Sequence, residues 1–132
     1  MSTSLDGRPA ELLTGVNFAT VVTQDPDGRP HASVAWVHTD GTSVLLNSAE
    51  GRRWPRQLRD RGEALVVVRS EENPYEYVEI RARLVEDTHE GAREQIDELS
   101  HKYLGKDYPF LQPGEQRIRF GLAPTEVAHR GG

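Results

Sequence analysis

Positive charge is concentrated in one short stretch of this chain, EGRRWPRQLRDRGE, at residues 50–63. The stretch holds five arginines within ten positions, namely Arg52, Arg53, Arg56, Arg59 and Arg61. The 132-residue chain as a whole is acidic, with a formal net charge of -5 at pH 7. Because guanidinium groups bind phosphates and carboxylates strongly and often in pairs of bonds, the stretch is a candidate anion site.

Pro55 decides where the helix that carries these arginines begins. A proline costs ~3 kcal/mol in a helix interior but is tolerated in the first turn, so we expect the helix to start near Trp54. Arg52 and Arg53 then lie in the preceding turn, beside unpaired N–H groups and the positive end of the helix dipole. We interpret these two arginines as anion ligands, with Arg56 one turn further along.

Residues before Arg52 add to the candidate anion site, whereas the arginines after Arg56 are not expected to belong to it. Asn47 and Ser48 end the preceding expected strand and bring side-chain donors, and Gly51 lets a ligand approach the backbone closely. Arg59 and Arg61 alternate with acidic residues, as on a solvated helix face, so we interpret both as surface residues.

The composition limits the classes of protein that this chain can be. The acidic net charge argues against bulk nucleic-acid binding, which needs a strongly basic face. No run approaches the ~20 apolar residues of a membrane span. The chain has no cysteine, and its histidines lack the spacing of metal ligands. We expect one soluble, cytoplasmic domain over residues 1–132, without a metal, a membrane or a nucleic-acid partner.

The pattern of apolar and turn-forming residues predicts an α+β protein. It predicts a three-stranded antiparallel meander over residues 17–24, 31–38 and 43–48. Further strands are expected at 64–70, 77–87 and 117–129, the last one bent at Pro124, and further helices at 8–14 and 88–104. About six mostly antiparallel strands with two or three helices make a small barrel.

Two local patterns give specific predictions. Asp87 with Glu90 three residues later resembles a capping box at the start of the helix expected at 88–104, and Gly105 is expected at its C′ position. Alternation along the strand at 77–87 predicts that one face is buried. The residues on that face are Val78, Ile80, Ala82 and Leu84.

Four stretches carry a resemblance that covers residues 17–129. They are FATVVTQDPDGRPHASVAWVHTDG, LLNSAEGRRWPRQLRDRGEALVVV, ENPYEYVEIRARLVED and ELSHKYLGKDYP. In this order and spacing the chain resembles the split β-barrel flavin and deazaflavin oxidoreductases, which are similar to pyridoxamine 5′-phosphate oxidase. Within that family it resembles the branch that uses the deazaflavin coenzyme F420.

The resemblance implies a homodimer with two cofactor sites at the subunit interface, each built from both chains. It implies that the segment matching residues 47–58 binds the cofactor's phosphate and that the strand matching 32–37 lies along the ring. With Gly51, the implied phosphate or tail contacts are Asn47, Ser48, Arg52, Arg53, Arg56 and Gln57, and the implied ring contacts are Val34, Ala35 and Trp36. Coenzyme F420 is an extended polyanion that suits a row of arginines, and FMN is the alternative.

The chain departs from the family pattern at two positions of this segment. Close relatives often read Gly-Arg-x-Lys-x-x-Asn-Leu, whereas this chain has Trp54 at the lysine position and Gln57 at the asparagine position. Arg53 can replace the lost charge from the neighbouring position. The choice between FMN and the deazaflavin stays open on this pattern.

The resemblance implies hydride transfer between the cofactor ring and a conjugated small-molecule substrate, such as an enone, a quinone or a linear tetrapyrrole. A proton donor or a cationic hydrogen-bond donor speeds such a step. The candidates are Tyr75, Tyr77, His38, Tyr103 and Lys106. Tyr75, on an expected loop, is the predicted catalytic residue, and Tyr77 and Lys106 are also counted among the cofactor contacts.

Three alternatives to a deazaflavin-dependent enzyme remain. The first is an FMN-dependent enzyme of the same family. The second is a protein of the same fold that binds a flavin, a deazaflavin or a haem-derived ligand without turnover. The third is a small barrel that binds single-stranded nucleic acid through the arginine stretch. The acidic net charge and the lack of aromatic residues interleaved with basic strands count against this third alternative.

Overall fold

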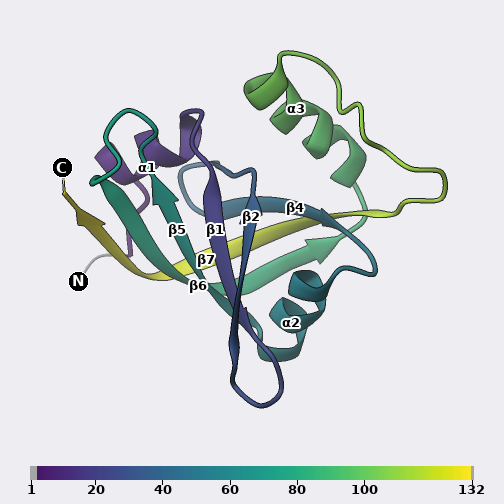
Figure 1. Ribbon diagram of the computed structural model, residues 1–132, viewed down its shortest axis with the longest axis horizontal. Coiled ribbons are helices and arrows are strands. Elements are labelled where there is room, and N and C mark those ends of the chain that lie inside the picture. Colours follow the sequence, from purple (N-terminus) through teal and green to yellow (C-terminus); the bar gives the residue numbers. More distant parts are fainter. Residues whose placement is uncertain (1–2, 132) are drawn as a thin grey trace.

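The computed structural model describes residues 3–131, and within this range seven strands form one antiparallel sheet flanked by three helices (Figure 1). The helices are α1 (Gly7–Thr14), α2 (Arg53–Arg61) and α3 (Ala92–Leu104). The strands are β1 (Ala19–Gln24), β2 (Pro30–Ala35), β3 (His38–Thr39), β4 (Val44–Ala49), β5 (Glu63–Arg69), β6 (Tyr77–Thr88) and β7 (Arg117–Arg130). The predicted α+β class is confirmed.

The sheet curls because two neighbouring strands of the chain lie at its opposite edges. The strand order is β2-β1-β5-β6-β7-β4-β3, and only Trp36 and Val37 separate β2 from β3 in the sequence. So short a link forces the two edges to approach each other, and Figure 1 shows β2 crossing in front of the long β6 and β7 strands. The predicted small barrel is therefore confirmed, in an open, half-barrel form.

The predicted meander is only partly correct. Residues 19–24 and 30–35 pair as a hairpin, with Ala19 opposite Ala35, but β4 pairs with β3 and β7 and not with β2. The strand expected at 31–38 breaks at Val37, whose N–H is bonded to the Tyr103 hydroxyl and whose carbonyl accepts from Lys102. Side chains of α3 thus bind the N–H and C=O groups of Val37, which in a continuous strand would be available for pairing with β4.

The predicted start of α3 is wrong by several residues. The helix begins at Ala92 after Gly91, whose φ of 73° is left-handed, and β6 continues through Thr88. The Asp87 carboxylate makes no cap, because it is bonded to the Arg59 guanidinium. The predicted end at Gly105 is confirmed: its φ is 77° and its N–H is bonded to carbonyls of the last helical turn.

The remaining helices and strands follow the sequence pattern closely. Helix α1 ends at Thr14, with Gly15 as its C-cap, and α2 begins at Arg53, one residue before the expected Trp54. On β6, Val78, Ile80 and Ala82 are buried as predicted, and Leu84 packs against the same core. The expected bend near Pro124 is a register shift between β6 and β7, which leaves Thr125 unpaired.

Candidate functional site

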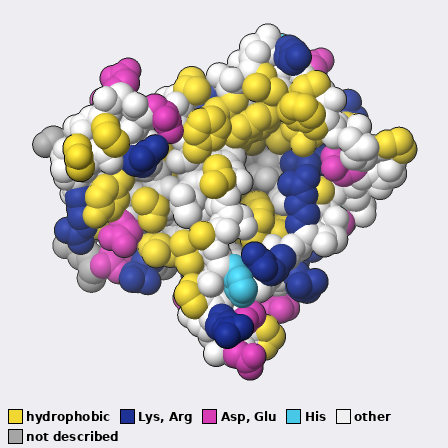
Figure 2. Space-filling model, viewed as in Figure 1, with side chains coloured by type: hydrophobic (Ala, Val, Ile, Leu, Met, Phe, Trp, Pro, Cys, Tyr) yellow, Lys and Arg dark blue, Asp and Glu magenta, His cyan; other side chains and the backbone are white. Residues whose placement is uncertain are grey.

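A cleft with a volume of about 250 Å³ opens between α3, the link after β2, and the ends of β4 and β7. Figure 2 shows this hollow, with hydrophobic side chains on one rim and basic side chains along another edge. The basic groups that line it are Arg52, from the turn between β4 and α2, and Arg117, from the first position of β7. We call this hollow the main cleft.

One wall of the main cleft is aromatic. Trp36 stacks on Tyr103, with ring centroids 5.1 Å apart and planes within 7°, and it meets Tyr108 edge to face at 6.0 Å. Tyr108 in turn contacts Phe110, and the buried Leu99 of α3 completes the apolar lining. Flat apolar walls of this kind suit a planar, conjugated ligand.

Asn47 and Arg117 form the polar floor of the main cleft. The buried Asn47 amide donates to the Ala92 carbonyl at 2.9 Å and to Gln95 Oε1 at 2.8 Å. Its Oδ1 accepts from Arg117 Nε at 2.9 Å, and the Arg117 guanidinium lies 5.1 Å from the centre of the Tyr108 ring. Because Asn47 is hydrogen-bonded both to the first turn of α3 and to Arg117, this network fixes the start of α3 and the buried Arg117 guanidinium in position.

The β4–α2 turn and the first turns of α2 present exposed cationic groups. Gly51 has a φ of 92°, and no atom lies within 4 Å of the place where its Cβ would be, so the backbone is open to a ligand. Arg52 is the N-cap of α2, and its side chain makes no cap bond. Arg53 and Arg56 are exposed, and neither has an ion-pair partner among residues 3–131. Arg52, Arg56 and Gly51 also line an adjoining hollow of about 230 Å³.

The two arginines interpreted as surface residues are engaged by the chain itself. Arg59 forms paired bonds with Glu50, at 2.8 and 3.0 Å, and with Asp87, at 2.7 and 2.9 Å. The bonds that Arg59 makes to Glu50, with a contact from His89, lower the pKa of Glu50 to about 2. Arg61 donates to the Asp25 carbonyl at the tip of the β1–β2 hairpin. Both side chains therefore brace α2, and Arg59 ties it to the end of β6.

The structure brings some predicted cofactor contacts together and places others elsewhere. Five of them line the main cleft, namely Val34, Ala35, Trp36, Asn47 and Arg52. Ser48 is fully buried, and Gln57 is buried against β1, where it accepts from the Thr23 hydroxyl at 2.8 Å. Neither of these two side chains lines the main cleft.

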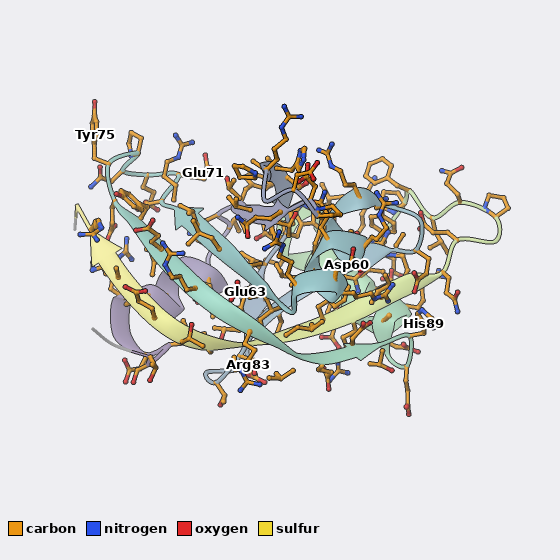
Figure 3. All side chains as sticks on the ribbon, turned by 90° about the horizontal axis from the view of Figure 1, so that it is seen from below. Asp60, Glu63, Glu71, Tyr75, Arg83 and His89 are labelled. Carbon is orange, nitrogen blue, oxygen red and sulfur yellow. The ribbon has the colours of Figure 1, made fainter. Side chains whose placement is uncertain are left out.

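The predicted proton donors lie outside the main cleft of a single chain. Tyr75 is 82% exposed on the loop between β5 and β6 and points away from the body of the protein (Figure 3). Tyr77 begins β6, and Lys106 is exposed on the loop after α3. His38 lines a smaller hollow, and burial lowers its pKa.

Tyr103, the remaining candidate donor, holds the link between β2 and β3 in place. Its hydroxyl donates to the Asn17 carbonyl at 2.5 Å and accepts from the Val37 N–H, and burial raises its pKa. Lys102 donates beside it to the Leu13 and Val37 carbonyls, and burial lowers its pKa to about 8. Both groups act as supports for the aromatic wall.

Sequence reasoning missed several residues of the main cleft, among them Tyr108, Phe110 and Arg117. Tyr108 and Phe110 lie on an irregular loop, whose path no periodicity predicts. Arg117 meets Asn47 across 70 positions of sequence. Nothing in the local pattern RIRF distinguishes it from Arg119, which pairs with Glu86 instead.

Two general properties of the described part of the chain bear on function. No group of three or more His, Asp or Glu side chains within residues 3–131 is arranged to hold a metal ion. None of the helices in the same range is long and apolar enough to cross a membrane.

Comparison with solved structures shows the same fold in proteins of low sequence identity. An F420 reductase superposes with a TM-score of 0.80 at 21% identity, covering 93% of this chain and 98% of that one. Protein Rv2991 of Mycobacterium tuberculosis superposes with a TM-score of 0.72 at 16% identity, covering 98% and 88%. A Listeria innocua protein named after pyridoxamine 5′-phosphate oxidase gives 0.62 at 20% identity, covering 85% and 86%.

Sequence comparison assigns the family. No curated protein matches the chain significantly in sequence. The profile of the pyridoxamine 5′-phosphate oxidase family, however, matches residues 5–131, which is nearly the whole chain. The half-barrel sheet and its flanking helices agree with this match, so the fold is the split barrel that the sequence resemblance implied. This chain therefore belongs to the pyridoxamine 5′-phosphate oxidase family.

Proposed function

We propose that this protein is an oxidoreductase that uses coenzyme F420 and transfers hydride to a conjugated organic substrate, with FMN as the alternative cofactor. One observation carries the proposal: an aromatic cleft fit for a flat ring adjoins a helix N-terminus with exposed arginines, of which Arg53 and Arg56 have no ion-pair partner in the described chain. The similarity to an F420 reductase, at 21% identity, supports the choice of the deazaflavin.

The residues present fit the two chemical halves of such a coenzyme. Val34, Ala35 and Trp36 would lie along the ring, on the apolar side of the main cleft. Arg52 would meet the phosphate where the main cleft joins the adjoining hollow. Arg53 and Arg56 would follow a polyanionic tail, since both guanidiniums are exposed and face no carboxylate of the described chain.

The protein would act as a homodimer, because the main cleft of one chain is open and rimmed by exposed apolar side chains. Val34 is 74% exposed, Phe110 57% and Phe18 42%, and all three line this cleft. A second copy covering them would remove apolar surface from water and close the cleft. The exposed loop of Tyr75 would then be available to the partner's site, which keeps the predicted catalytic role of Tyr75 within the proposal.

The bound coenzyme would supply the hydride chemistry, and the chain would supply position, charge and exclusion of water. The aromatic wall would hold the ring flat, and the substrate would stack on its open face. Enones, quinones and linear tetrapyrroles are suitable, because each is a planar conjugated acceptor. The Arg117 guanidinium at the polar floor would stabilise negative charge that develops in the cleft during the transfer.

Turnover of the reduced deazaflavin tests this function. The purified protein is mixed with reduced coenzyme F420 and with menadione or biliverdin, and the absorbance of the oxidised coenzyme is followed. We expect oxidation that depends on both protein and acceptor, with reduced FMN in parallel to establish which cofactor serves. Binding of the coenzyme without its oxidation by any acceptor would contradict the enzymatic proposal and favour a ligand-binding protein.

A further inference from the structure

One carboxylate stands between the two arginines of the main cleft. Glu115 Oε2 accepts from Arg117 Nη1 at 3.4 Å, and Glu115 Oε1 lies 3.9 Å from Arg52 Nη2. The Glu115 side chain is only 12% exposed, whereas that of Arg52 is 51% exposed. The chain thus places an anion of its own beside two guanidinium groups of a site that we assign to an anionic ligand.

The local backbone holds Glu115 in this position. Residues 112–115 read Gln-Pro-Gly-Glu, with a Glu115 N–H bond to the Gln112 carbonyl and a φ of 74° at Gly114. Proline followed by a residue with positive φ is the signature of a type II turn, a rigid connection. The next residue, Gln116, accepts the Glu50 N–H through its carbonyl, so this loop is bonded to the β4–α2 turn itself.

The charges decide what this arrangement does. A ligand phosphate that reaches Arg52 meets the Glu115 carboxylate within a few ångströms, in a partly buried place where like charges repel strongly. A phosphate ester carries a charge of about -1.5 to -2 near pH 7, against -1 for a carboxylate, so it can outcompete Glu115 for the guanidinium.

We propose that Glu115 sets the affinity of this site for anions: it competes with the ligand for Arg52, so that a phosphate binds only by displacing this carboxylate from the guanidinium. The inference rests on the proposed function, because that function assigns Arg52 to the coenzyme's phosphate. It adds that the affinity of the site is held below the value its arginines alone would give. Arg53 and Arg56, which have no such competitor, remain fully available to the rest of a polyanion.

The substitution Glu115→Gln tests the inference, since it removes the charge and keeps both the size and a hydrogen-bond acceptor for Arg117. Glu90→Gln is the matched control: it removes one charge from an exposed turn that does not line the main cleft. Dissociation constants for pyrophosphate, FMN and coenzyme F420 are measured at one ionic strength through the fluorescence of Trp36 and Trp54. We expect pyrophosphate and the coenzyme to bind Glu115→Gln about tenfold more tightly than wild type, and Glu90→Gln to bind within about twofold of wild type.

The outcomes separate this inference from the proposed function. Coenzyme binding to wild type with equal or weaker binding to Glu115→Gln would overturn the inference, because Glu115 would then only orient the arginines. Tighter pyrophosphate binding to Glu115→Gln, with no binding of either coenzyme to any variant, would uphold the inference and overturn the proposed function. Pyrophosphate binding to neither protein would also overturn the inference.

Discussion

At the scale of single residues, neighbouring arginines of one short segment have different partners and therefore different roles. Arg59 is bonded to two carboxylates and Arg61 to a backbone carbonyl, whereas Arg53 and Arg56 have no ion-pair partner in the described chain. Sequence spacing predicted a division between these two groups, from the alternation with acidic residues and the position relative to Pro55, but the partners of Arg59 are Glu50 and Asp87 and not its acidic neighbours in the sequence. It did not reveal Glu115 or Arg117, which reach the site from the other end of the chain.

Replacing Arg52 by alanine is expected to weaken binding of the coenzyme about tenfold without loss of folding. A charge-assisted hydrogen bond contributes roughly 1.5 to 3 kcal/mol, and the lower end applies because the Arg52 side chain is half exposed. Arg69→Ala, on β5, removes an arginine of similar exposure, at 56%, outside the main cleft and is the control. Titration with FMN and the deazaflavin measures both, and an unchanged affinity in Arg52→Ala would refute the assignment.

Replacing Asn47 by alanine is expected to destabilise the protein by about 1 to 3 kcal/mol, because buried partners then lose their hydrogen bonds. The groups left without Asn47 are the Ala92 carbonyl, the Gln95 amide oxygen and Arg117 Nε. Urea unfolding gives the free energy difference. Asn73→Ala, in the exposed loop before β6, is the comparison, and equal stabilities of the two variants would show that the Asn47 network is unimportant.

At the scale of elements, ion-pair networks fix the helices to the sheet. Glu76, which precedes β6, accepts from Arg8 of α1 at 2.6 and 2.8 Å, and its Oε2 lies 2.7 Å from His129 Nε2 near the end of β7. One carboxylate thus joins three segments from the beginning, middle and end of the sequence. The bonds from Arg8 and His129 lower the pKa of Glu76 to about 2.

The bonds from Arg8 and His129 to Glu76 make the free energy of unfolding depend on pH in the acidic range. Because the pKa of Glu76 is lower in the folded state than the roughly 4.3 of an unfolded glutamate, its contribution is complete above about pH 5. The contribution is lost as the pH falls towards 2. We expect Glu76→Gln to be less stable than wild type at pH 7, with the difference shrinking below pH 4. Urea unfolding at several pH values, with Glu72→Gln as control, measures this, and a constant difference would contradict it.

The elements also show where local patterns lose their power to predict. The period-two alternation and the Pro and Gly signals located β5, β6, α1 and the end of α3 within a residue or two. The start of α3 was predicted wrongly because the expected cap, the Asp87 carboxylate, is bonded to Arg59 and does not cap the helix. The meander failed at Val37 because a tyrosine and a lysine of α3 bind its backbone, which no local pattern records.

At the scale of the whole molecule, the order of motifs was the information that predicted the split barrel. Strand patterns alone allowed a meander, and a meander does not carry β2 and β3 to opposite edges of one sheet. The resemblance to a family supplied this topology, and the match over residues 5–131 agrees with it. Tyr75 is exposed and does not line the main cleft of its own chain, so its proposed catalytic role requires a dimer in which it reaches the partner's cleft.

A charge placed on the apolar rim is expected to break the proposed dimer. Val34→Glu puts a carboxylate on a side chain that is 74% exposed in a single chain and would be covered by the partner. Sedimentation should give a dimer for wild type and for the control Thr42→Glu, in the exposed β3–β4 turn, and a monomer for Val34→Glu. A wild-type monomer across the micromolar range would rule out a site completed by two chains.

A crystal structure of the protein with coenzyme F420 tests the central claim most directly, namely that the main cleft and the β4–α2 turn together hold an anionic redox coenzyme. We expect the ring to lie along Val34, Ala35 and Trp36 and the phosphate to lie within hydrogen-bonding distance of Arg52. A coenzyme bound away from Arg52, or a main cleft that stays empty at saturating coenzyme, would show that this site does not hold the coenzyme.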